Sequence, residues 1–110
     1  MKLSDIVNKL SLEVKSHGSG LEKDISGVYV SDLLSDVMAN SIEGNIWVTL
    51  QTHMNVVAVA SMKGLAGIII VGGRKIPEDV IEKAESEQTT VMTTSSPAFE
   101  VAGKLYELLS

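Results

Sequence analysis

The feature of this sequence that most limits its fold is the apolar run Ile-Ile-Ile-Val at residues 68–71, which Gly72 and Gly73 follow directly. Four consecutive β-branched residues are typical of a strand that is buried on both faces at the centre of a parallel sheet. Parallel strands are usually joined by helices, and apolar residues at helical spacing lie on both sides of the run, over 55–63 and 77–84. The sequence therefore predicts an α/β fold.

The same alternation extends over the rest of the chain. Helical spacing of apolar residues predicts helices over 3–10, from about 33 to 40, and from about 98 to the C-terminus. Period-two alternation and short β-branched runs predict strands over 12–14, 27–30, 45–51 and 89–93, and the glycines of 17–20 indicate a turn or loop. We expect one three-layer domain over residues 1–110, with a mainly parallel central sheet and helices on both faces.

Small polar residues before three of the helices predict helix caps. Ser31 precedes a helix that would hold Asp32 in its first turn, and Thr52 precedes the helix over 55–63. Ser96 precedes Pro97, which suits the first position of a helix. Each predicted cap therefore follows the end of a predicted strand.

Charge, cysteine content and the length of the apolar stretches exclude several classes of function. Nine Lys and Arg against fourteen Asp and Glu give a net charge of −5, which disfavours binding to a nucleic-acid backbone or an anionic membrane surface. The absence of cysteine removes disulfides, thiolate nucleophiles and thiolate metal sites. The N-terminus lacks the apolar run of a signal peptide, and no apolar stretch reaches the roughly 20 residues of a membrane-spanning helix. We expect a cytoplasmic protein with no nucleic-acid or membrane partner.

Four segments carry a resemblance to a known family: YVSDLLSDVMAN at 29–40, WVTLQTH at 47–53, GIIIVGGR at 67–74, and the stretch 77–84. They resemble the stand-alone DRTGG-domain proteins of bacteria and archaea, and they are also similar to the N-terminal domain of HPr kinase/phosphorylase. The likeness covers nearly the whole chain, and its first segment is the most specific. The sequence departs from the family name, because it holds no Asp-Arg-Thr-Gly-Gly string and Gly72-Gly73-Arg74 is the nearest match.

The resemblance implies an α/β regulatory domain that is often homodimeric. Relatives stand alone or are fused to CBS domains or phosphotransacetylases, and some are encoded beside hydrogenase or redox genes. The catalytic half of HPr kinase carries a phosphate-binding loop of the form G-x-x-x-x-G-K-[ST], which this sequence lacks. We therefore expect the fold of the regulatory half without the kinase, and we assign no catalytic residue.

A candidate ligand site follows two strands of the second half of the chain. Its residues are Gly72, Gly73 and Arg74 after the apolar run, and Thr93, Thr94, Ser95 and Ser96 after the next strand. Ligands of open α/β sheets bind beyond the carboxyl ends of the strands, where glycine amides and an arginine fork can hold an anion. The pattern favours a nucleotide or another phosphate-bearing metabolite. The alternative is a tight strand exit with ordinary helix capping.

Three other polar side chains support a competing hypothesis of catalysis. Asp32 and Asp36 are four residues apart on a predicted helix, so they would share a face and could hold Mg²⁺ or a cationic partner. The alternative is that Asp32 complements the start of the helix and Asp36 is a solvated side chain. His53 could act as a general base or metal ligand; otherwise it starts a helix or lies in an interface. A small magnesium-dependent enzyme would unite all three in one concave site with perturbed pKa values.

A last group of residues forms a candidate interface or ligand rim. Its members are Ser31, Asp32, Ser35, Asp36, Asn40, Trp47, Thr52, His53 and Asn55. Trp47, the only tryptophan, lies on the opposite face of its predicted strand from Ile46 and Val48. It is either covered by a helix on the second face of the sheet or exposed as the anchor of a subunit contact.

Together these observations predict a non-catalytic regulatory module that forms a homodimer and binds a small anionic metabolite or nucleotide, a partner protein, or both. The ligand would act through its differential affinity for two packing or dimer states. One alternative is a structural adaptor of a redox, hydrogenase-linked complex, with an apolar patch around Trp47 and no cavity at the strand ends. The other alternative is the small magnesium-dependent enzyme.

Overall fold

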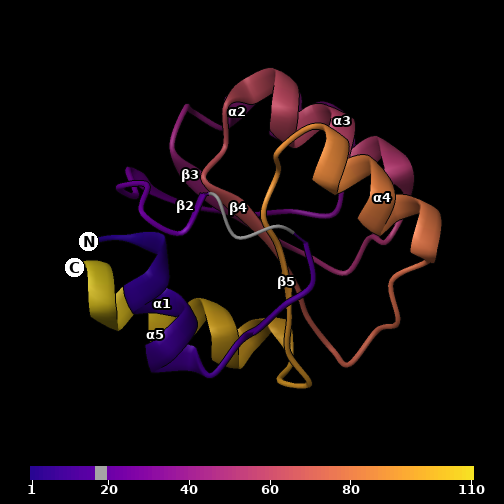
Figure 1. Ribbon diagram of the computed structural model, residues 1–110. Helices are drawn as coiled ribbons and strands as arrows, with labels where there is room; N and C mark the ends of the chain where they lie inside the picture. The colour runs from indigo at the N-terminus through magenta and orange to yellow at the C-terminus, as the bar shows by residue number, and fades with distance from the viewer. Residues whose placement is uncertain (17–19) are drawn as a thin grey trace.

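The chain alternates helices and strands as the sequence pattern predicted (Figure 1). The computed structural model describes residues 1–16 and 20–110, so the loop predicted over 17–20 lies outside the described residues except for Gly20. The elements are α1 (Leu3–Leu10), β1 (Glu13–Val14), β2 (Gly27–Val30), α2 (Leu34–Asn40), β3 (Asn45–Thr49), α3 (Met54–Lys63), β4 (Gly67–Ile70), α4 (Glu78–Ser86), β5 (Val91–Thr93) and α5 (Ala98–Leu109). No helix in the described ranges is both long and apolar enough to cross a membrane.

The strands form one mixed, mostly parallel sheet in the order β1-β5-β4-β3-β2. From β2 to β5 all neighbours are parallel, with Val48 opposite Ile69 and Ile69 opposite Met92. The short strand β1 is antiparallel to β5, with Glu13 opposite Thr93. The predicted α/β class is therefore confirmed, and the apolar run of 68–71 supplies the central strand β4.

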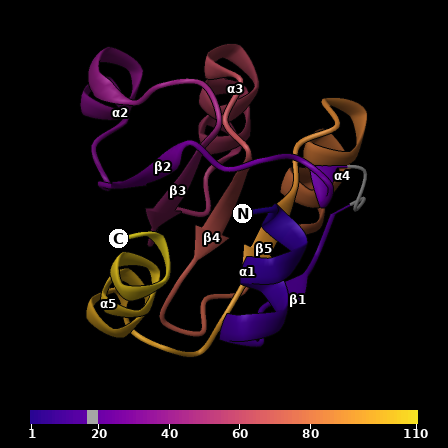
Figure 2. The same cartoon turned by 90° about the vertical axis from the view of Figure 1, so that its left-hand side faces the viewer.

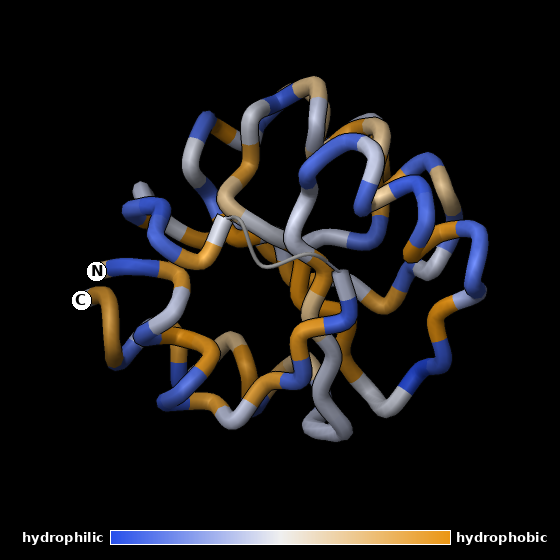
Figure 3. The backbone as a smooth tube through the Cα atoms, viewed as in Figure 1, coloured by the Kyte–Doolittle hydropathy of each residue, from blue (hydrophilic) through white to orange (hydrophobic). Residues whose placement is uncertain are grey.

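Helices cover both faces of this sheet (Figure 2). Strand residues that point to one side, such as Val48 and Ile69, pack in a buried cluster with α1 and α5. Their neighbours Trp47 and Ile68 point to the other side and pack in a second cluster with α2, α3 and α4. Figure 3 shows the result, with apolar residues concentrated along the strands and on the inner sides of the helices. Burial on both faces explains why these strands are continuously apolar.

Residues 20–26 cross the amino ends of the strands on the way from one sheet edge to the other. Gly20 lies so close to the start of β5 that an added Cβ would come within 2.6 Å of Thr90 Oγ1. At the other edge, the Ser26 N–H donates a 3.0 Å hydrogen bond to the Gly44 carbonyl, just before β3. Because this crossing occupies the amino ends, the carboxyl ends of the parallel strands are left to the loops that follow β2, β3, β4 and β5.

Candidate functional site

The loop after β4 turns sharply on two glycines. Gly72 and Gly73 have φ angles of +78° and +67°, a left-handed conformation that glycine adopts at the least cost. Their N–H groups donate to the carbonyls of Ser96 and Thr94, at 2.9 and 3.0 Å. The expectation that these two amides would hold an anion is therefore wrong, because they already join the end of β4 to the end of β5. These two amides are therefore not free to act as donors for an anion.

A cavity of about 680 Å³ lies beyond the carboxyl ends of β4 and β5. Its walls come from three separate parts of the chain: Gly73, Arg74, Lys75, Ile76, Glu78 and Ile81; Thr93, Thr94 and Ser95; and Ser11, Glu13 and Lys15. The volume falls within the roughly 300–1,000 Å³ that small-molecule sites occupy. Most of the predicted ligand residues therefore line one cavity, and the exceptions are Gly72 and Ser96, which are hydrogen-bonded to each other.

Three cationic side chains line this cavity. The Lys15 ammonium lies 3.1 Å from a carboxylate oxygen of Glu13, and both side chains are partly exposed. Arg74 and Lys75 form no ion pair with any residue in the described part of the chain. An unpaired guanidinium beside an unpaired ammonium suits a phosphate group, since the planar arginine fork binds two oxygens at once.

The end of β5 has a local hydrogen bond that changes the start of α5. The Ser96 N–H donates to Thr94 Oγ1 at 3.2 Å, and α5 begins at Ala98 with Pro97 as its N-cap. The predictions of Ser96 as the cap and Pro97 as the first helical residue are therefore wrong by one position. A hydroxyl that bonds the backbone two residues on competes with helix capping in this way.

Sequence reasoning missed two of the three cations. Lys75 follows Arg74 directly, so the pair of adjacent positive charges was a usable signal. Lys15 is sixty residues away in the sequence and reaches the cavity only because β1 pairs with β5. No local pattern encodes that antiparallel register.

At the other half of the same sheet edge, Asp32 joins the ends of β2 and β3. One of its carboxylate oxygens, Oδ1, accepts hydrogen bonds from Thr49 Oγ1 at 2.8 Å and from the Leu50 N–H at 2.7 Å. The Gln51 side chain adds a bond to the Asp32 carbonyl at 3.2 Å. Asp32 therefore precedes α2 and does not lie in its first turn. Its carboxylate accepts hydrogen bonds at the end of β3.

Trp47 is completely buried, which confirms the alternative in which helices cover it and contradicts the alternative of an exposed subunit anchor. Its indole Nε1–H donates to the Ser31 carbonyl at 2.8 Å, and its ring packs in the cluster with α2, α3 and α4. Ser31 does not cap α2, because its hydroxyl accepts from the Leu33 N–H, before the helix begins. The adaptor hypothesis required an apolar patch around Trp47 and no cavity at the strand ends, and the structure contradicts both requirements.

Asp36 is held by partners different from those of Asp32. Its two carboxylate oxygens accept from the Tyr29 hydroxyl at 2.8 and 2.9 Å, and Oδ1 also accepts from the Asn40 side chain at 2.9 Å. Hydrogen bonds from Asn40 and Tyr29 lower the pKa of Asp36, and the bond to Asp36 raises the pKa of Tyr29. This network joins α2 to β2, so the two aspartates do not form a carboxylate pair. Ser35 is exposed on the same helix.

His53 is the N-cap of α3, the position predicted for Thr52. Its Nδ1 accepts a 3.1 Å hydrogen bond from the Asn55 N–H. His53 and Thr52 line a cavity of about 460 Å³ that contains neither Asp32 nor Asp36. Within residues 1–16 and 20–110, no group of three or more His, Asp or Glu side chains could hold a metal ion. The united site required by the magnesium-enzyme hypothesis is therefore not formed.

Comparisons with known proteins agree with this fold. A crystal structure of the CBS and DRTGG domains of the regulatory region of Clostridium perfringens pyrophosphatase, complexed with the activator diadenosine tetraphosphate, is similar at a TM-score of 0.72 and 22% identity. The match covers 94% of this chain but 45% of that one, so this chain spans less than half of its neighbour's length. The neighbour is a pyrophosphatase region, and similarity to HPr kinase stays a prediction.

A search of curated proteins finds no match. The model of the DRTGG domain, in contrast, matches residues 5–108, which is almost the entire chain. The match extends through the β4 and β5 ends that form the cavity and through the Asp32 and Trp47 contacts of the other half. On this basis, the chain belongs to the DRTGG domain family.

Proposed function

We propose that this chain is a regulatory module that binds a nucleotide or another phosphate-bearing metabolite in the cavity at the carboxyl ends of β4 and β5. The observation that carries the proposal is the unpaired Arg74 and Lys75 in a cavity of ligand size. The chain as a whole has a net charge of −5, so these cations are a local departure from its charge balance. Such a departure favours an anionic ligand.

The cavity offers a separate surface for each part of such a ligand. Arg74 and Lys75 supply charged donors for phosphate oxygens, and the hydroxyls of Thr93 and Ser95 supply neutral hydrogen bonds. Ile76 and Ile81 give the cavity an apolar wall, against which a base or another flat group can pack. The mixture of charged, polar and apolar walls is more suitable for a nucleotide than for inorganic phosphate alone.

The structural neighbour supports the same ligand class. Its regulatory region is complexed with diadenosine tetraphosphate, which is a nucleotide activator. That region contains CBS domains as well as a DRTGG domain, so the support concerns the class of ligand and not its place in this chain.

Regulation follows from how the cavity is built. A ligand in it would contact β1, the loop after β4 and the end of β5, which are joined through the β1–β5 pairing, the β4–β5 pairing and the glycine amides. Binding would therefore favour one relative arrangement of these three parts over others, by the difference in affinity between them. A second copy of the chain or a partner protein would respond to that arrangement. The proposal assigns no catalytic residue.

The experiment is a thermal-shift screen followed by calorimetric titration, with ATP, diadenosine tetraphosphate and inorganic phosphate as probes. A ligand at about 100 times its dissociation constant stabilises the folded state by about 2.7 kcal/mol. We expect a saturable shift with a nucleotide probe, and an affinity at least about tenfold weaker in Arg74→Ala, the loss of about 1.4 kcal/mol expected for a charged contact.

The matched control is Lys23→Ala, which removes one exposed positive charge from the segment at the opposite, amino ends of the strands. This variant should bind the probe as the unmodified chain does. The proposal is contradicted if no probe shifts the melting temperature, or if Arg74→Ala and Lys23→Ala bind with equal affinity.

A further inference from the structure

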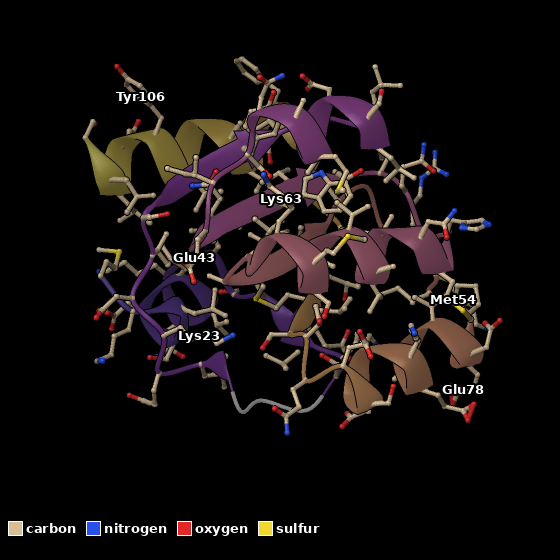
Figure 4. The ribbon with its side chains drawn as sticks, turned by 90° about the horizontal axis from the view of Figure 1, so that it is seen from above. Lys23, Glu43, Met54, Lys63, Glu78 and Tyr106 are labelled. Atoms are coloured by element: carbon tan, nitrogen blue, oxygen red, sulfur yellow. The ribbon has the colours of Figure 1, made fainter. Side chains whose placement is uncertain are left out.

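The outer edge of β2 and the neighbouring side of α5 together expose an unusual amount of apolar surface. The exposed fractions are 50% for Val30, 87% for Phe99, 75% for Tyr106 and 36% for Leu109. Figure 4 shows Tyr106 pointing away from the body of the molecule, on the outer side of α5. We call these four residues, with the strand edge between them, the β2–α5 surface.

This surface contains a groove as well as projecting side chains. Between β2 and α5 lies a cavity of about 370 Å³, lined by Gly27, Val28 and Val30 on the strand and by Ala102, Tyr106 and Leu109 on the helix. Phe99 stands on the same helix. A groove and a protruding aromatic side chain on one face are the two halves of a self-complementary contact, which a symmetric dimer requires.

The spacing along α5 fits a second copy that runs in the opposite direction. Phe99, Ala102, Tyr106 and Leu109 follow one another at intervals of three, four and three residues, so they form one stripe along the helix. In an antiparallel pair of such stripes, Phe99 of one copy lies beside Leu109 and Tyr106 of the other. Tyr106 and Leu109 line the groove.

The backbone of β2 has a free edge in the same surface. The Ser31 N–H donates to the Val48 carbonyl of β3. In a strand, the backbone groups of successive residues point alternately to the two sides. The N–H and C=O groups of Val28 and Val30 therefore point away from β3. Sheet edges of this kind pair readily with another strand. A two-fold axis across β2 would place Val28 opposite Val30 of the second copy, and Val30 opposite Val28.

The surface supplies roughly the apolar share of a standard dimer interface. An aromatic side chain buries about 150–250 Å² when it is covered, so Phe99 and Tyr106 offer on the order of 300 Å² at their exposures, and the two aliphatic residues raise the total to roughly 400 Å². A standard interface buries about 800 Å² per partner, of which somewhat more than half is apolar. None of the four residues is charged, and the exposed charges beside them on α5 are of both signs: Glu100, Lys104 and Glu107.

We propose that two copies of this chain associate through the β2–α5 surface, with Phe99 of each copy seated in the groove of the other. This interface replaces the one predicted around Trp47 and His53, since Trp47 is buried and His53 caps α3. It lies on a different edge of the sheet from the ligand cavity, which is formed at β1, β4 and β5. The proposal therefore does not depend on the ligand.

The test is the molar mass in solution, measured by sedimentation equilibrium. We expect the unmodified chain to have twice the monomer mass of 11.7 kDa, and Phe99→Glu and Tyr106→Glu each to have the monomer mass. Both side chains are largely exposed, so glutamate should leave the fold intact, which circular dichroism checks. Val30→Lys, a charge on the strand edge, is a third way to weaken the same contact without touching α5.

Met62→Glu is the matched control, because Met62 is 70% exposed on α3, which covers the other face of the sheet. Met62→Glu and Arg74→Ala should both remain dimeric. A monomer mass for the unmodified chain at about 100 μM, a concentration that populates any dimer of micromolar affinity, would overturn the proposal. A dimer that persists in Phe99→Glu, Tyr106→Glu and Val30→Lys would overturn it too.

Discussion

The two halves of the carboxyl edge of the sheet use similar residues in different ways. At β2 and β3, the polar groups bond to each other: Asp32 accepts from Thr49 and Leu50, and the Trp47 indole donates to Ser31. At β4 and β5, the amides of Gly72 and Gly73 are satisfied, but Arg74 and Lys75 have no ion-pair partner in the described residues. In the first half, which we call the closed half, these polar groups are used in hydrogen bonds at the strand ends, and the cavity beside it at Thr52 and His53 has no Lys or Arg in its lining. In the second half, which we call the open half, unpaired cations line a cavity.

This difference indicates which polar residues belong to the fold and which are available for a ligand. A side chain whose hydrogen bonds all end within the protein stabilises one conformation and has little left to offer another molecule. A guanidinium without a partner contributes nothing of that kind to folding, and its binding capacity is intact. Substitutions at β2 and β3 should therefore reduce stability, and substitutions at β4 and β5 should change ligand affinity.

The largest expected effect is at Trp47, on the closed half. Trp47→Ala removes the largest fully buried side chain and should lower the free energy of unfolding by about 3–5 kcal/mol. Trp47→Phe keeps most of the packing but leaves the Ser31 carbonyl without its indole donor, so it should cost clearly less. Urea denaturation of both variants measures the difference. Equal losses in the two would show that the hydrogen bond, and not the packing, dominates.

A smaller loss is expected at Asp32. Asp32→Ala removes the acceptor for Thr49 Oγ1 and for the Leu50 N–H, and we expect a decrease of about 1–2 kcal/mol in the free energy of unfolding, because the site is exposed. The affinity for a nucleotide probe should be the same as in the unmodified chain. A large decrease in affinity with unchanged stability would reverse the comparison and place the ligand at β2 and β3.

Most of the fold was accessible from the sequence because it depends on local periodicity. The β-branched run at 68–71 predicted a central parallel strand, and the helices on either side of it followed from the spacing of residues such as Val56 and Val80. Helix starts were less accessible. Ser31 and Ser96 lie in sequence contexts that suit helix capping, but both form local hydrogen bonds before the helix begins: the Ser31 hydroxyl accepts from the Leu33 N–H, and the Ser96 N–H donates to Thr94 Oγ1.

The site was accessible only in part, because a cavity combines segments that are distant in sequence. Arg74 and Thr93 were predicted together, since both follow neighbouring parallel strands, and the structure brings them to one cavity. Lys15 was missed because it depends on the pairing of β1 with β5. The hydrogen bond of the Gly72 N–H was missed as well, because its acceptor, the Ser96 carbonyl, belongs to a loop that is distant in the sequence.

The Asp36 network should make the closed half sensitive to acid. Hydrogen bonds from Asn40 and Tyr29 lower the pKa of Asp36 from its ordinary value of 3.8. A carboxyl group of this kind stabilises the fold above its unfolded pKa, and the contribution is lost as the pH falls through the lower, folded pKa. Asp36→Asn should therefore be less stable than the unmodified chain at neutral pH, and the difference should disappear in strong acid. Urea denaturation at a series of pH values measures it.

Tyr29 provides the complementary check at high pH. The hydrogen bond to Asp36 raises the pKa of the Tyr29 phenol from its ordinary value of 10.0, so its contribution is present below that value and is lost as the pH rises through the folded pKa. In Tyr29→Phe, this alkaline loss should be absent. A stability difference between Asp36→Asn and the unmodified chain that stays constant from neutral to acid pH would mean that the carboxylate charge has no part in the network.

The smallest expected effect is at Glu78, on the open half. Glu78 lines the cavity with Arg74 and Lys75. It is the first residue of α4 (Figure 4). Glu78→Gln removes a negative charge that opposes an anionic ligand, so the affinity for a nucleotide probe should rise by about two- to threefold, the range of an exposed charge interaction. The same change should lower stability by a few tenths of a kcal/mol, because Glu78 interacts favourably with the helix N-terminus. Glu82→Gln, one turn further along α4 and exposed outside the cavity, should change neither quantity appreciably. If Glu78→Gln instead weakened binding, Glu78 would itself be a ligand contact, and the open half would bind a group that carries hydrogen-bond donors or positive charge in addition to phosphate.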